Sequence, residues 1–254
     1  SQLLSVRHDI SPSLDVDIQS YWRDISESSD LVAQAQANTE RPPEGVFSWV
    51  QTVGYASMRI VESPNKAYAG RMVTDLADDL GISPFELLLR LIVNDGDKSM
   101  VTLGAIQEED IQVIMKQPWA MISSDGREIN VNHPRSRGAF PRVLGRYVRD
   151  WGVLTLEEGV HKISGLPASY LKLSDRGVIQ EGNIADITVF DPNTIIDKST
   201  WSQPELYSEG IVHVLIGGEF SLRNSEVSQK RFGRFIPFKL DMNISKNINM
   251  TADM

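Results

Sequence analysis

The carboxylate of Asp125 is the side chain of this 254-residue protein best placed to do chemistry. It stands in the sequence SSDG at 123–126, directly after the short apolar run WAMI at 119–122. We expect the apolar run to be a buried strand whose end presents the carboxylate to a polar loop. The catalytic groups of α/β barrels lie at strand ends in this way. The pattern predicts a catalytic carboxylate, the alternative being an Asp that caps the next turn, where Asp-Gly is common.

The loop that follows Asp125 is strongly cationic. Residues 127–142 contain four arginines, two prolines and His133, which stands in the sequence HPR at 133–135. The chain holds three other histidines, His8, His161 and His213, and no two histidines are close enough in sequence to form a His-x-His or His-x3-His pair. A histidine-rich metal site would therefore need ligands from elsewhere.

Composition limits the class of protein. The 41% hydrophobic and 23% charged residues are typical of a globular chain, long enough for one α/β domain or a domain with a smaller appendage. A net charge of -9 argues against a nucleic-acid partner or an anionic membrane surface. No apolar stretch approaches the twenty or so residues of a membrane-spanning helix, and the first residues are too polar for a signal peptide.

The absence of cysteine excludes disulfides, thiolate zinc sites and cysteine nucleophiles. It fits either the cytoplasm or the periplasm. The cytoplasm is the default expectation.

The elements that must position Asp125 alternate between helices and strands up to about residue 175 and are mostly β beyond it. Periodicity, caps and turn residues predict helices within 19–37, at 72–80, from Pro84 to about 93, at 107–115, at 155–163 and at 167–171. Strands are predicted within 47–60, at 119–122, within 185–190 and at 212–216. We therefore expect an α/β domain over 1–175, a β segment over 176–240 and a loose tail over 241–254.

Two groups of motifs resemble known enzymes. LPA at 166–168, DRGVI at 175–179, EGNIADITVFDP at 181–192 and VLIGG at 214–218 resemble the closing segment of metal-dependent amidohydrolases. A narrower resemblance, to D-aminoacylases (N-acyl-D-amino-acid deacylases), is carried by SDG at 124–126, HPR at 133–135, GAFPRVLG at 138–145 and LEEGVHKISGLPA at 156–168. The resemblance runs from about residue 58 to 218. It implies the C-terminal half of a (β/α)8 barrel and part of a small β-sandwich.

The resemblance also implies a chemistry. Asp125 matches the family's strand-eight aspartate, which lies at the zinc, takes a proton from the metal-bound water and later passes it to the leaving amine. An N-acyl amino acid carries a free carboxylate, which Arg135 can bind through two parallel hydrogen bonds; a solvated loop arginine is the alternative. His133 is predicted to contact substrate or orient the loop, against a purely structural role before Pro134.

The chain also departs from the family pattern. Family enzymes are longer and carry a His-x-His motif, a bridging Cys or Lys and two further histidines, none of which is found here. Ser123 also replaces the usual glycine before Ser-Asp-Gly. We therefore expect a portion that is inactive alone and needs a missing N-terminal half or a partner chain that supplies it. A hydantoinase-like or dihydroorotase-like cyclic-amide hydrolase and a non-catalytic subunit or remnant are the alternatives.

Overall fold

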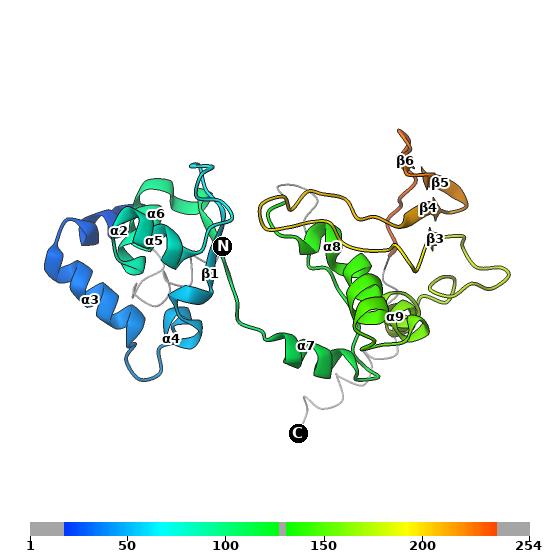
Figure 1. The fold of residues 1–254 in the computed structure, drawn as a ribbon, viewed down its shortest axis with the longest axis horizontal. Coiled ribbons are helices and arrows are strands. Elements are labelled where there is room, and N and C mark those ends of the chain that lie inside the picture. The colour runs from blue at the N-terminus through cyan, green and yellow to red at the C-terminus, as the bar shows by residue number, and fades with distance from the viewer. Residues whose placement is uncertain (1–17, 127–130, 238–254) are drawn as a thin grey trace, which may run out of the picture. The chain divides into compact units, whose positions relative to one another are not determined.

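The first part of the chain is mostly helical. The structure, a computed structural model, describes residues 18–126 and 131–237. In the first of these ranges lie α2 (Ile18–Ser26), α3 (Ser29–Glu40), α4 (Trp49–Val53), α5 (Val73–Leu80), α6 (Pro84–Asp95) and α7 (Glu108–Met115). Short 3-10 turns lie at Tyr55–Ser57 and Gly96–Lys98, and the strands are β1 (Met58–Glu62) and β2 (Met100–Leu103). Figure 1 shows their order along the chain.

Two of the predicted helix boundaries are confirmed in atomic detail. The Ser83 hydroxyl accepts a hydrogen bond from the Glu86 amide at 3.1 Å, and Pro84 occupies the first helical position of α6. Gly81 ends α5 in the left-handed conformation, with φ of 66°. These boundaries were predictable because each depends on neighbours in sequence.

The second described range begins with α8 (Arg135–Arg142), which continues into a π-helix, η3 (Val143–Asp150). α9 (Leu156–Ile163) and α10 (Gly165–Tyr170) follow. The predicted capping box of α9 is present, with Thr155 and Glu158 each bonding the other's backbone amide. Four strands complete the described chain: β3 (Ile187–Phe190), β4 (Ile211–Ile216), β5 (Glu219–Arg223) and β6 (Glu226–Val227).

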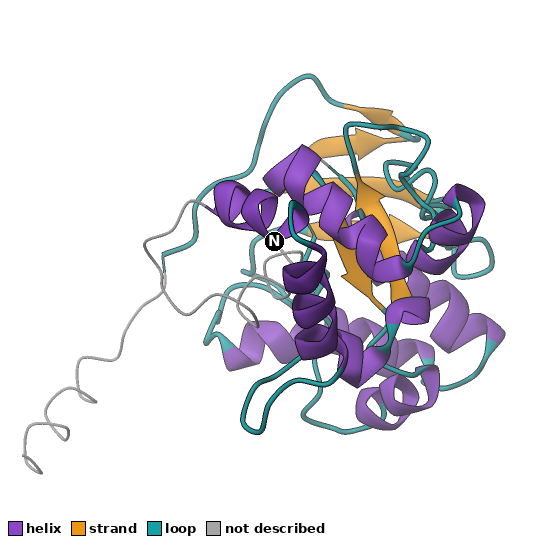
Figure 2. Cartoon of the chain, turned by 90° about the vertical axis from the view of Figure 1, so that its left-hand side faces the viewer, coloured by secondary structure: helices purple, strands orange, loops and turns teal. Residues whose placement is uncertain are grey.

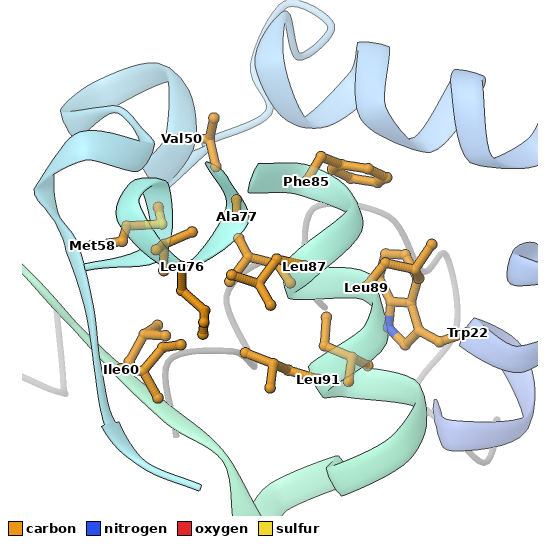
Figure 3. Close-up of a cluster of buried hydrophobic side chains, with 14 of the residues drawn as sticks. Trp22, Val50, Met58, Ile60, Leu76, Ala77, Phe85, Leu87, Leu89 and Leu91 are labelled. Atoms are coloured by element: carbon orange, nitrogen blue, oxygen red, sulfur yellow. The ribbon is translucent and has the colours of Figure 1, made fainter. Parts of the chain in front are cut away.

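The chain divides into two units. One comprises residues 1–117, 124–139 and 198–207, and the other comprises 118–123, 140–197 and 208–254. In the first unit α5, α6 and the β1–β2 pair enclose a core that also includes Trp22 of α2 (Figure 3). Its fully buried members include Trp22, Met58, Ile60, Leu87 and Leu88. In the second unit β3 to β6 form an antiparallel meander. The predicted domain boundary at residue 175 stays a prediction.

The mixed α/β class is confirmed, as the helices and strands in Figure 2 show. The strands, however, differ from those of a barrel. Every strand pair in the described ranges is antiparallel, whereas barrel strands pair in parallel. Within 47–60, the first residues form α4 because Ser48 caps a helix there, and only the end of the segment is a strand. The predicted helix within 19–37 is two helices, because Ser28 caps a new one.

The predicted strand at 119–122 is wrong. These residues are irregular, and Trp119 is 67% exposed while only Ala120 is buried. The segment is held by α9 and not by a neighbouring strand: the Ile122 amide donates to the Lys162 carbonyl at 3.1 Å. A second hydrogen bond to α9 runs from the Lys162 ammonium to the Ala120 carbonyl at 3.2 Å, so these backbone groups of the run are paired without a neighbouring strand. The predicted tail at 241–254 lies outside the described residues. None of the helices in the described ranges is both long and apolar enough to cross a bilayer.

Candidate functional site

Asp125 lies in a sharp backbone turn. Its φ of 46° is left-handed, a conformation that costs most residues energy but that Asp tolerates better than most. The next residue, Gly126, has no room for a side chain, because a Cβ would lie 2.8 Å from the Cα of Ser136. The Gly126 amide donates to the Ser124 hydroxyl at 3.2 Å. The turn therefore leaves the Asp125 side chain 80% exposed.

The turn brings Asp125 onto Arg135, the first residue of α8. A guanidinium nitrogen of Arg135 lies 2.8 Å from the Asp125 carboxylate, and the Arg135 side chain is itself 46% exposed. The structure thus brings together two of the side chains that the sequence singled out. An accessible guanidinium beside an accessible carboxylate can bind an anion next to an acid–base group.

His133 completes the group. Its Nδ1 accepts a hydrogen bond from the Arg135 amide at 3.1 Å, so the proton of the neutral ring is on Nε2. Burial, reinforced by the positive charge of Arg135, lowers the pKa of His133 to about 4, although the Asp125 carboxylate opposes the shift. His133 is therefore neutral near pH 7 and can donate a hydrogen bond from Nε2.

The other arginines of the cationic loop are engaged elsewhere. Arg142 forms an ion pair at 2.8 Å with Asp197, whose side chain is only 6% exposed. Arg137 lies over the ring of Tyr207, 4.9 Å from its centroid. Arg127 lies outside the described residues. Among the loop arginines that the structure describes, Arg135 is the one placed beside Asp125.

Trp201 and Ser199 also contact the turn at 133–135, and neither was predicted from the sequence. The Trp201 ring meets the His133 ring edge-on, with centroids 4.6 Å apart, and the Ser199 hydroxyl donates to the Pro134 carbonyl at 2.8 Å. Arg59 of β1 lies over the same tryptophan, 5.4 Å from its ring centroid. Residues 199 and 201 follow Asp125 by more than seventy positions and belong to no motif, so nothing in their spacing points to the site.

The residues described do not provide a complete metal site. In these ranges no three His, Cys, Asp or Glu side chains gather closely enough to hold a metal ion. His161 lies exposed on α9, and His213 of β4 stacks edge-on against Phe220. His8 lies outside the described residues. Asp125 can offer a carboxylate oxygen to zinc, but the other donors of such a site are not found beside it.

Comparison with known proteins identifies the family. The model of the amidohydrolase family matches residues 73–221. The N-acyl-D-glutamate deacylase of Alcaligenes xylosoxydans xylosoxydans is 45% identical over 115 residues, which are 45% of this chain and 24% of the relative. The D-aminoacylase of the same organism is 36% identical over 156 residues, or 61% of this chain and 31% of the relative.

A solved structure agrees with these matches. The N-acyl-D-glutamate deacylase of Bordetella bronchiseptica, crystallised with zinc and a phosphonate mimic of the tetrahedral intermediate, superposes with a TM-score of 0.59 at 32% identity. The match covers 74% of this chain and 43% of that structure. The chain spans less than a third of the length of the two Alcaligenes relatives. A family match over more than half of its residues and a shared fold together show that this chain belongs to the amidohydrolase family, among proteins similar to the D-aminoacylases.

Proposed function

We propose that this chain is the C-terminal portion of a zinc-dependent amidohydrolase that hydrolyses the amide bond of N-acyl-D-amino acids. The observation that carries the proposal is the pairing of Asp125 with Arg135 at 2.8 Å, beside neutral His133. An acid–base group next to an anion-binding group suits a substrate whose amide lies close to a free carboxylate. The similarity to N-acyl-D-glutamate deacylase supports the substrate class.

Each of the three residues has a proposed role. Asp125 takes up a proton as water attacks the amide carbon and returns it to the leaving amine. Arg135 binds the substrate carboxylate through parallel hydrogen bonds and so holds the amide near Asp125. His133, held neutral, orients the turn and offers the Nε2 proton to a substrate oxygen. The described residues do not fit a complete zinc site, so the roles end at these groups.

The proposed architecture follows the family. Residues 1–175 would supply the last part of the barrel, and 176–240 part of the β-sandwich. The antiparallel pairing of β1 with β2 differs from the barrel's parallel strands. We attribute the difference to absent barrel strands, which the missing half or a partner chain would supply, and we expect this chain alone to be inactive.

A complementation experiment tests the function. The Alcaligenes N-acyl-D-glutamate deacylase is produced without the segment that matches this chain, and this chain is supplied as a second polypeptide. We expect D-glutamate to be released from its N-acyl derivative when both polypeptides are present. Neither polypeptide alone should release it. The positive control is the relative's own segment supplied in the same way. Restoration by that segment but not by this chain would contradict the proposal.

Two variants connect the activity to the site. Asp125→Asn removes the base but keeps the size of the side chain, and we expect it to lower kcat by at least about a hundredfold. Arg135→Met is expected to raise KM at least about tenfold because a charge-assisted bond to the substrate is lost. Turnover restricted to cyclic amides would favour the hydantoinase-like alternative. Full activity of Asp125→Asn would make the chain a non-catalytic subunit.

A further inference from the structure

The segment 198–202 is far from the HPR turn in sequence but lies against it in the fold. Ser199 is 7% exposed, and its hydroxyl donates to the Pro134 carbonyl at 2.8 Å. Two residues later the Trp201 ring meets the ring of His133 at a centroid distance of 4.6 Å and an interplanar angle of 65°. The segment therefore contacts consecutive residues of the turn, one through a hydrogen bond and one through a ring.

The Pro134 carbonyl is an acceptor at the start of α8. It also accepts hydrogen bonds from the amides of Arg137 at 3.2 Å and Gly138 at 2.9 Å. A third donor, Ser199, fixes the direction of this carbonyl and so the direction in which α8 begins. Since Arg135 is the first residue of that helix, the orientation of its backbone depends on the same contact.

Trp201 also contacts β1. The guanidinium of Arg59 lies 5.4 Å from the centre of the indole and donates to the Gly70 carbonyl at 2.6 Å. A cation over an aromatic face is attracted by the ring quadrupole, which favours Trp most. A Cβ at Gly70 would lie 3.6 Å from the Trp201 carbonyl, so the two backbones also pass close to each other. The indole thus links β1 to His133.

We infer that Trp201 and Ser199 are positioning residues for substrate binding: together they hold the His133–Arg135 turn against β1 and so direct the Arg135 guanidinium. This role rests on the proposed function for its consequence in catalysis. The contacts themselves are properties of this chain alone. His133 connects Trp201 to Arg135, because its Nδ1 accepts a hydrogen bond from the Arg135 amide while its ring packs on Trp201.

The first test uses the 254-residue chain and needs no activity. An indole at 4.6 Å shifts the resonances of the His133 ring protons through its ring current. In proton–carbon spectra, with His133→Gln as the assignment standard, Trp201→Ala should move these resonances to the position of an exposed histidine. Trp201→Phe should keep part of the shift. Tyr207→Ala, which removes a 72% exposed aromatic ring from the same part of the chain, should leave them in place.

Ser199 is tested by amide hydrogen exchange. Ser199→Ala should accelerate exchange of the amides of 136–138, which bond to carbonyls of the turn. Thr200→Ala, at an exposed neighbouring position, should not. Unchanged His133 resonances in Trp201→Ala, or equal exchange in the two hydroxyl variants, would overturn the inference. If circular dichroism shows that Trp201→Ala is unfolded, the His133 resonances of Trp201→Phe and the amide exchange of Ser199→Ala test the inference instead.

The second test measures the consequence in the complemented enzyme. Trp201→Ala should raise KM for N-acyl-D-glutamate at least about tenfold while kcat changes by less than about threefold, because binding and not proton transfer is lost. Trp201→Phe should recover most of the affinity. An unchanged KM would refute the positioning role. If the unmodified chain restores no turnover, the proposed function fails, and the spectra and exchange still decide whether the two residues hold the turn.

Discussion

A left-handed backbone at Asp125 limits which residues this position can hold. With φ of 46°, Asn and Gly adopt the conformation at little cost, whereas a β-branched residue does not. We expect Asp125→Asn and Asp125→Gly to unfold at the same urea concentration as the parent or slightly above it. Asp125→Val should lose about 1–3 kcal/mol of unfolding free energy.

The ion pair with Arg135 does not change this expectation. Its carboxylate is 80% exposed, and exposed pairs contribute little to stability. Urea denaturation of the three variants measures the difference. A loss in Asp125→Gly equal to that in Asp125→Val would show that the side-chain contact, and not the backbone conformation, dominates at this position.

The low pKa of His133 makes stability depend on pH. The pKa is lowered from 6.5 to about 4, chiefly by burial, so between these values the unfolded chain binds a proton that the folded chain does not. This contribution is complete above pH 6.5 and is lost as the pH falls toward 4. His133→Gln should therefore flatten the fall in unfolding free energy over that interval.

Carboxylates titrate over part of the same range, so the comparison is made between variants. Thr200→Ala, which removes no titratable group from an exposed position, should leave the slope of the parent unchanged. Equal slopes for His133→Gln and the parent would mean that His133 is as solvated in the folded chain as in the unfolded chain.

At the scale of elements, caps were predictable and strand pairing was not. Ser83, Gly81 and the Thr155–Glu158 box act on residues within one turn, so sequence alone locates them. The run 119–122 has the composition of a strand, but a strand also needs a partner, and this run attaches to α9 instead. The same limit applies to the site: Asp125, His133 and Arg135 lie within eleven positions of each other, whereas Trp201 reaches them only through the fold.

The π-helix η3 packs tightly against the residues that follow β3. A Cβ at Gly145 would lie 2.4 Å from the Ile195 carbonyl and 2.7 Å from the Cδ1 of Ile196. Gly145→Ala should therefore lower the unfolding free energy by about 1–3 kcal/mol, the usual cost of overpacking. Gly233→Ala, where nothing lies within 4 Å of the added atom, is the matched control and should be neutral in the same thermal or urea measurement.

Lys162 holds the segment that leads to Asp125. The side chain is 5% exposed and donates to the Ala120 carbonyl at 3.2 Å, while its own carbonyl accepts the Ile122 amide. Lys162→Met removes the cost of burying a charge but takes a donor from the Ala120 carbonyl, and these two effects on the free energy of unfolding oppose each other. Lys162→Met should therefore change global stability little but accelerate amide exchange of residues 120–123. Slower or equal exchange there would show that the backbone bond alone holds the segment.

At the scale of the whole molecule, the proposed chemistry requires a zinc site that the described residues do not complete. In the described ranges no three metal-ligating side chains gather, so we expect the purified chain to bind zinc less tightly than micromolar chelators and to hydrolyse no N-acyl-D-amino acid. Elemental analysis after gel filtration, together with a deacylase assay, checks both points. Stoichiometric zinc with turnover would require a ligand set that includes residues outside the described ranges.

The order of the chain through its two units explains why the site was only partly predictable. The first unit receives three separate pieces of chain, of which 124–139 carries Asp125 and Arg135 and 198–207 carries Trp201. Motif spacing identifies residues within one piece. Contacts between pieces depend on how non-local parts of the fold pack, and no local pattern encodes them.

Because Asp125 contacts Arg135, its carboxylate competes with the substrate carboxylate for the Arg135 guanidinium. In the proposed roles, a carboxylate that binds Arg135 competes with the carboxylate already 2.8 Å from one of its nitrogens. An exposed ion pair is worth at most about 1 kcal/mol, so this competition weakens substrate affinity by no more than about fivefold. In return, the arriving anion frees the Asp125 carboxylate from Arg135 so that it can face the reacting amide. Small carboxylates in the buffer should compete for the same guanidinium and so act as weak inhibitors.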